Sequence, residues 1–211
     1  MKKILLFVPK GFEILEFASL VDVMGWAKTE CALPVDLTTC GFTKQVKSAF
    51  GVEVTVDTLF EEISANDYDA LAIPGGFEVF GFYEHVYDER LLDLIRRFDA
   101  EKKIIASICV GSLPIAKSGV LKRRRATTFK SDDGLRKGQL RDFGALVQKE
   151  HVVVDNNVIS SDGPDTAQAV AFKLLELLTS PKDARRVQAA MGFETENAQG
   201  DFFVSFFKNN G

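Results

Sequence analysis

The alternation of short apolar runs with longer amphipathic segments limits most strongly what this chain can fold into. Apolar segments at helical spacing cover residues 13–30, 88–100 and 166–179. Between them, most of the apolar runs lack strict alternation, so we expect strands that are covered on both faces, as in a parallel sheet. The order predicts a single-domain α/β fold, a three-layer sandwich with right-handed crossovers. The predicted strands are residues 4–8, 35–40, 69–74, 103–109, 126–129 and 151–161.

Two segments depart from this pattern. Residues 44–63 alternate polar and apolar side chains around Gly51, which predicts an antiparallel, hairpin-like excursion. A further helix is expected from residue 181, and the tail at 200–211 then crowds four phenylalanines into six residues. We therefore expect one domain over residues 1–190 and an extension, residues 191–211, that packs on the domain or on a partner subunit.

Composition excludes several classes of protein. The chain has 211 residues, of which 46% are hydrophobic and 27% charged, with a formal net charge of -4, as in ordinary soluble globular proteins. The basic cluster at residues 122–125 is expected to form a solvated turn, and no nucleic-acid partner is predicted. No apolar run approaches the ~18 residues of a membrane span. The N-terminal run ends at Pro9 and is expected to be a first strand, not a signal peptide.

The cysteines indicate a reducing compartment. Cys31, Cys40 and Cys109 are odd in number and lack metal-type spacing, so we expect reduced thiols, a cytoplasmic protein and no metal site. The pairing of Cys31 with Cys40 stays open at this stage.

Cys109 stands out as a candidate nucleophile. In open α/β sheets the chemistry lies at the carboxyl ends of the strands, which here selects residues 9–16, 74–76, 109–111 and 160–164. Cys109 ends a predicted strand and is followed by the small residues Gly111 and Ser112, as expected of a tight strand-to-helix turn. The helix that follows would favour a thiolate. Cysteine at the end of a buried strand is also a common core residue, and this alternative stays open.

Ordered motifs add a resemblance. The chain is similar to the ThiJ/PfpI superfamily over residues 1–190, which implies a flavodoxin-like (Rossmann-like), class I glutamine amidotransferase-like domain, a homodimer and no cofactor. The motifs that carry the resemblance are GFEILEF (11–17), AIPGGF (72–77), SICVGS (107–112), RRRATTF (123–129) and SSDGPDTAQAVAFKLLELL (160–178).

The resemblance also implies site residues. Cys109 would be the elbow nucleophile and Glu16 its carboxylic partner, with a raised pKa because two negative charges repel in a partly dry pocket. Protonated, Glu16 would donate to the sulfur or move a proton. The alternative is that Glu13 and Glu16 are ordinary acidic residues of a first helical turn, which we favour for Glu13. The backbone amides expected to hold a developing oxyanion are those of Gly75, Gly76 and Val110.

This chain departs from the family's pattern at three positions. Val110 and Phe129 stand where many relatives have histidine, and Asp162 stands where deglycase-like members have arginine. His85, in an aromatic segment after residues 74–76, either lines the rim of the pocket or lies on the surface. We expect His151 to be structural or exposed.

Three functions follow as hypotheses. The first is a cysteine-dependent hydrolase or lyase acting on a small carbonyl or amide electrophile, in the manner of a glyoxalase or deglycase. The second is a non-enzymatic redox-sensing or stress-protective, chaperone-like protein that uses oxidation of Cys109. The third is a scaffold that acts through its surface. Peptidase activity is the least supported, because it depends on a Cys-His pair.

Overall fold

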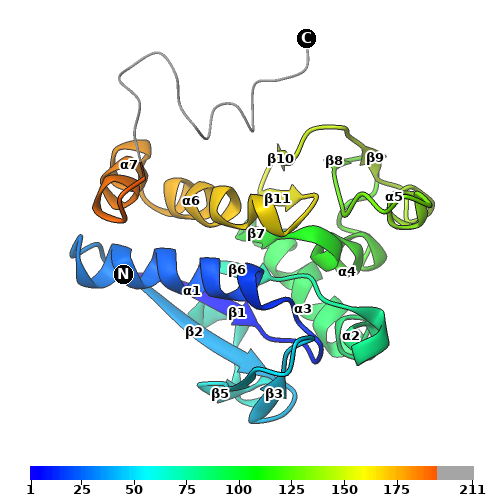
Figure 1. Ribbon diagram of the computed structural model, residues 1–211, viewed down its shortest axis with the longest axis horizontal. Coiled ribbons are helices and arrows are strands. Elements are labelled where there is room, and N and C mark those ends of the chain that lie inside the picture. Colours follow the sequence, from blue (N-terminus) through cyan, green and yellow to red (C-terminus); the bar gives the residue numbers. More distant parts are fainter. Residues whose placement is uncertain (194–211) are drawn as a thin grey trace.

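The computed structural model describes residues 1–193 as a seven-stranded sheet with helices around it (Figure 1). The strand order is β10-β11-β7-β6-β1-β2-β5, and every neighbouring pair is parallel except β10 with β11. The α/β fold with a mainly parallel sheet is therefore confirmed. The strands of this sheet are β1 (Lys2–Phe7), β2 (Val35–Gly41), β5 (Thr58–Leu59), β6 (Ala70–Ile73), β7 (Ile104–Ser107), β10 (Val152–Asp155) and β11 (Val158–Ser161).

The crossovers place helices on both faces. The chain steps from β1 to β2 in one direction along the sheet and from β6 to β7 in the other, so right-handed connections put α1 and α3 on opposite faces. Helix α6 contacts both α1 and α7 and lies beside them in Figure 1. The helices are α1 (Ile14–Thr29), α2 (Phe82–Val86), α3 (Glu89–Ala100), α4 (Ser112–Lys117), α5 (Leu135–Asp142), α6 (Ala167–Leu178) and α7 (Pro181–Ala190).

The core follows the central strands. Residues 4–8 of β1 and its continuation are fully buried, as are all four residues of β6, because a central parallel strand has helices over both faces. None of the helices within residues 1–193 has the length and apolar character needed to cross a membrane.

The predicted excursion after β2 is confirmed as an antiparallel pair, β3 (Gln45–Lys47) with β4 (Glu53–Thr55), outside the main sheet. Two strand predictions are corrected. The run 151–161 is not one strand but the hairpin β10–β11, which turns at Asn156 with φ 55°, a conformation that asparagine adopts more readily than most residues. The run 126–129 forms only the short β8 (Arg125–Ala126), which pairs with β9 (Leu146–Val147) in a separate sheet.

The phenylalanine-rich tail lies outside the described residues, so its packing on the domain or on a partner subunit stays a prediction. The division into residues 1–190 and 191–211 stays a prediction.

Candidate active site

Cys109 occupies the turn that connects β7 to α4. Its φ is 56°, in the left-handed region, where a residue with a Cβ costs roughly 1–2 kcal/mol. A single 3₁₀ turn, Cys109–Gly111, leads into α4. The turn lies tightly against the end of β6, because a Cβ on Gly111 would lie 2.6 Å from the carbonyl oxygen of Ile73. Only glycine fits at residue 111 without moving backbone.

Hydrogen bonds hold the Cys109 backbone in this conformation. The hydroxyls of Ser112 and Thr128 both donate to the Cys109 carbonyl oxygen, at 3.2 and 3.0 Å. Thr128 comes from the segment that was predicted as a strand and instead passes under the site. The strain at Cys109 is thus supported by two buried side chains, as expected where a turn serves chemistry.

Glu16 approaches Cys109 from the first turn of α1. Its side chain is fully buried, and its Oε2 accepts the Gly75 amide proton at 2.5 Å. Its Oε1 is buried and makes no hydrogen bond to nitrogen or oxygen within residues 1–193, and the carboxyl interacts with the Cys109 thiol. A Cβ on Gly75 would lie 2.8 Å from Glu16 Oε2 and 2.9 Å from Cys109 Cβ. Glycine at residue 75 therefore permits the contact between the acid and the thiol.

Burial shifts both titrating groups of this pair. Loss of solvation raises the pKa of Glu16 to about 8, against the lowering effect of the Gly75 hydrogen bond. Burial and the neighbouring Glu16 raise the pKa of the Cys109 thiol, although the Val110 amide lowers it. The expectation that a helix would favour thiolate is not met, because α4 has only six residues and burial dominates.

The pair opens onto a small cavity of about 140 Å³. Arg136 of α5 supplies a cation there, ion-paired with Glu78 at 2.7 Å and stacked on the Tyr83 ring at 5.0 Å. The lining residues are Glu13, Glu16, Gly76, Phe77, Glu78, Tyr83, Cys109, Val110, Phe129, Arg136 and Pro164.

Most of the predicted site residues meet at this cavity, but Gly75 does not serve as expected. Its amide already donates to Glu16, so it has no proton left for an oxyanion and that prediction is wrong. The Gly76 amide has no hydrogen-bond partner within the described chain, and the Val110 amide faces the Cys109 sulfur. The Gly76 amide is therefore unengaged, and the Val110 amide is the backbone donor that contacts the sulfur.

Two candidate rim residues lie elsewhere. His85 accepts a hydrogen bond from the Lys10 amide at 3.1 Å and packs its ring on Phe42, so it does not line the cavity. Burial lowers its pKa. Asp162 is nine-tenths buried and lies 3.1 Å from His151 Nδ1, also away from the lining. Its carboxyl therefore does not set the charge of the cavity wall directly.

Sequence reasoning missed Arg136 and assigned Glu13 to the helix start alone. Glu13 does cap α1, where its Oε2 accepts the Glu16 amide at 2.9 Å, and it also lines the cavity. Tyr83 belongs to the aromatic segment that contains His85 and was not predicted as a site residue. Arg136 lies in a charged helix without a motif, so no local signal marked it.

The other two cysteines are free thiols, and no disulfide joins Cys31 to Cys40. Within residues 1–193 no group of histidine, cysteine and acidic side chains is arranged to hold a metal ion.

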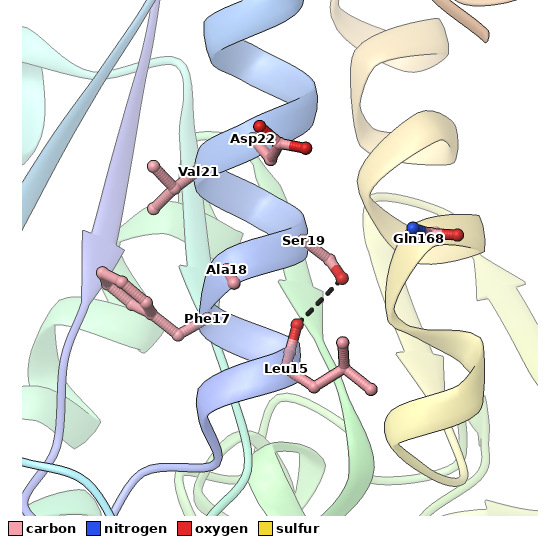
Figure 2. Close-up of a pocket in the computed structure, with 7 residues that line it drawn as sticks. All are labelled: Leu15, Phe17, Ala18, Ser19, Val21, Asp22 and Gln168. Atoms are coloured by element: carbon pink, nitrogen blue, oxygen red, sulfur yellow. Dashed lines mark hydrogen bonds between the residues drawn. The ribbon is translucent and has the colours of Figure 1, made fainter. Parts of the chain in front are cut away.

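A second, open groove of about 360 Å³ lies on the outer surface of α1 (Figure 2). All of its lining residues come from α1 except Gln168 of α6. Leu15 and Val21 are exposed apolar residues there, while Ser19 turns its hydroxyl back to the Leu15 carbonyl oxygen at 2.8 Å. The groove has no nucleophile or paired acid, so we assign no chemistry to it.

The family model of the DJ-1/PfpI family matches residues 2–177, which include β1, the Glu16 helix and the Cys109 turn. The chain belongs to the DJ-1/PfpI family. The resemblance inferred from the ordered motifs is thereby confirmed.

Curated relatives and solved structures agree with this membership. Drosophila melanogaster dj-1beta is 29% identical over 88% of this chain and 94% of its own length, and its crystal structure gives a TM-score of 0.80, with 92% and 98% of the two chains covered. Isonitrile hydratase from Pseudomonas putida is 31% identical over 70% of this chain and 61% of its own. Deglycase PfpI from Pyrococcus furiosus is 33% identical over 61% and 73%.

Proposed function

We propose that this DJ-1/PfpI family member is a cysteine-dependent hydrolase or lyase that acts on a small carbonyl or amide electrophile. Cys109 is the nucleophile and Glu16 moves the proton. The observation that carries the proposal is the fully buried Glu16 carboxyl, whose Oε1 has no nitrogen or oxygen partner in the described chain and which interacts with the thiol. Burial of a carboxyl oxygen without a nitrogen or oxygen partner costs free energy in the folded state, and such perturbed groups in a cavity mark functional sites.

The cavity supports a small substrate. Its volume of about 140 Å³ is below the ~300–1,000 Å³ of pockets that hold drug-sized ligands. One relative is named isonitrile hydratase, and an isonitrile is a small molecule. A peptide substrate is disfavoured by size, and by the fact that no histidine of the described chain lines the cavity.

The first step is addition of the sulfur to the electrophilic carbon. After the pair loses one proton, the remaining proton is held between Glu16 and Cys109. The Cys109 Sγ–carbon bond forms, the carbonyl π pair moves to the oxygen, and with an aldehyde the proton passes from Glu16 to that oxygen. With an amide, the oxygen pair then re-forms the carbonyl, the carbon–nitrogen bond breaks, and the amine leaves with the bonding pair and the Glu16 proton, so that the acyl group stays on the sulfur. The amides of Gly76 and Val110 are the backbone donors for the developing charge.

A substrate panel tests the proposal. Purified wild type, Cys109→Ser and Glu16→Gln are assayed with glyoxals, simple amides and isocyanides. We expect turnover by the wild type, none by Cys109→Ser, and turnover about 10²-fold slower by Glu16→Gln. Absence of turnover by the wild type, or unchanged turnover by Cys109→Ser, would contradict an enzymatic role. In that case, peroxide oxidation of Cys109 before Cys31 and Cys40, followed by mass spectrometry, would favour the redox-sensing function instead.

A second copy of the chain is the partner we propose, through the outer face of α1. Leu15 is 50% exposed and Val21 36%, and both border the open groove of Figure 2. Apolar residues grouped beside a groove are typical of association surfaces. We expect Val21→Asp to yield a monomer by sedimentation where the wild type is a dimer, and Asp22→Asn, a change in the same groove, to leave the dimer intact. A monomeric wild type would refute this interface.

A further inference from the structure

The lining of the Cys109 cavity includes Tyr83 of α2, whose buried hydroxyl lacks a hydrogen-bond partner among the described residues. An unsatisfied buried hydroxyl costs about 1–3 kcal/mol. Such a group in a folded protein calls for an explanation, and a ligand atom in the adjoining cavity would supply one.

The Tyr83 ring is held by contacts that leave its O–H free. The ring packs edge-on against Phe82 at 5.2 Å and beside Tyr87 at 4.9 Å. The Arg136 guanidinium lies 5.0 Å from its centroid and is itself fixed by Glu78 at 2.7 Å and Gln139 at 3.1 Å. The phenol is therefore oriented in advance of any ligand, at no further entropic cost on binding.

Tyr83 is also a donor and not a base. Burial raises the pKa of its hydroxyl well above the usual 10, outweighing the nearby Arg136 cation. The hydroxyl is close enough to Cys109 for the charges of the two groups to interact. The Tyr83 hydroxyl therefore keeps its proton near neutral pH.

The site needs such a donor. The Gly75 amide is already bound to Glu16, and no histidine from the described chain lines the cavity. Backbone donation rests on Gly76 and Val110 alone, and Val110 faces the sulfur itself. Tyr83 lines the cavity with a hydroxyl that has no partner among the described residues, whereas the Arg136 guanidinium in the same lining is already bonded to Glu78 and Gln139.

We propose that Tyr83 is a further catalytic residue, whose O–H donates a hydrogen bond to the oxygen that gains negative charge when Cys109 adds to the substrate. Arg136 is a positioning residue that fixes the Tyr83 ring. The inference rests on the proposed function and narrows it to substrates with an oxygen on the attacked carbon, such as aldehydes, ketones and amides. Tyr83 keeps its proton throughout the step, while the proton that ends on the product oxygen comes from Glu16.

Tyr83→Phe is the test, because it removes only the hydroxyl. For a small glyoxal we expect kcat/KM to fall by about 10²–10³-fold, the effect of deleting one oxyanion donor. Alkylation of Cys109 by iodoacetamide puts no charge on an oxygen, so its rate and pH profile should stay within about twofold of the wild type. Tyr87→Phe, in the adjoining ring and outside the cavity lining, is the matched control and should leave both rates unchanged.

The positioning role of Arg136 is tested by comparing Arg136 variants with Tyr83→Phe. Arg136→Gln should lower kcat/KM by less than Tyr83→Phe, and Arg136→Lys should restore part of the loss. The double variant should be no slower than Tyr83→Phe alone, because Arg136 acts through the hydroxyl. Additive losses would assign Arg136 a separate role.

Turnover by Tyr83→Phe within twofold of the wild type overturns the inference, and so does an equal fall in turnover and alkylation. Protection of Cys109 from iodoacetamide by a simple aldehyde separates this inference from the proposed function. If the wild type turns nothing over but is protected, and Tyr83→Phe needs at least about tenfold more aldehyde, the donor role holds and the enzymatic function fails. No protection of the wild type overturns both.

Discussion

Cys40 and Cys109 are two buried thiols near the carboxyl ends of parallel strands, and their surroundings differ. Cys40 lies within β2, in register with Phe7 of β1, is fully buried, and has a pKa raised by burial alone. Cys109 lies beyond the end of β7, with φ 56°, an acid beside it and a cavity before it. Burial raises the pKa of both thiols. Two features therefore distinguish Cys109 as the candidate nucleophile. An acid, Glu16, lies beside its thiol, and the thiol stands on a turn with positive φ.

The largest expected difference between the two thiols is in reactivity. Cys109→Ala should lower turnover by on the order of 10³-fold or more and remove the site of iodoacetamide incorporation at pH 8. Cys40→Ala should leave both nearly unchanged and cost about 1–2 kcal/mol of stability, because it deletes a well-packed sulfur. Mass spectrometry of the alkylated protein and chemical denaturation measure the two effects. Faster labelling of Cys40 than of Cys109 would reverse the comparison.

Glu16→Gln tests the role of the acid beside Cys109, which has no counterpart beside Cys40. The introduced glutamine side chain can still accept the Gly75 amide proton but cannot move a proton, so we expect turnover to fall by about 10²-fold. The Cys109 pKa should fall as well, because the acid helps to raise it. Alkylation near neutral pH should therefore become faster while turnover becomes slower. If both rates fall together, Glu16 is only a structural support of the turn.

Glu16→Gln should also change how the unfolding free energy depends on pH. The folded protein holds the Glu16 proton up to about pH 8, whereas the unfolded chain releases it near the usual 4.5. The unfolding free energy of the wild type therefore decreases as pH rises from about 4.5 to about 8, by on the order of 5 kcal/mol for the full shift. Glu16→Gln removes this decrease. Parallel stability profiles for the two proteins across that range would contradict the raised pKa of Glu16.

The smallest expected effect concerns the backbone. Glycine adopts a positive φ without penalty, so Cys109→Gly should be more stable than Cys109→Ala by about 1 kcal/mol. At residue 40, within an extended strand, the order should be the opposite, because glycine weakens a strand. Urea denaturation of the four variants checks both orders. Equal stabilities of Cys109→Gly and Cys109→Ala would mean that the turn stores no strain.

The parallel sheet brings the carboxyl ends of β1 and β7 to one edge, which selected the segments of Glu16 and Cys109. The pairing of Glu16 with Cys109 itself was expected from the family resemblance. Small residues after Cys109 marked the turn between strand and helix. The role of Gly75 could not be predicted, since its amide is taken by a carboxyl 59 residues away along the chain. Which donor remains free depends on side-chain packing and not on the motif.

Other misses have the same origin. Residues 127–129 have a strand-like composition, yet buried bonds such as Thr128 to the Cys109 carbonyl hold them under the site. Arg136 reaches the cavity only because α5 packs against α4. Asp162, within a family motif, lies instead against His151. Local pattern thus predicted the elements well, and tertiary contacts decided which polar groups face the cavity.

The hydrogen bond from Gly75 to Glu16 also gives the site a spectroscopic reporter. A carboxylate is a stronger acceptor than a neutral carboxyl, so loss of the Glu16 proton should pull the Gly75 amide proton toward the oxygen. The amide resonance of a single glycine would then shift downfield as pH passes through about 8. One peak in a heteronuclear NMR spectrum would follow the charge beside the thiol in the unmodified protein, with no substrate needed.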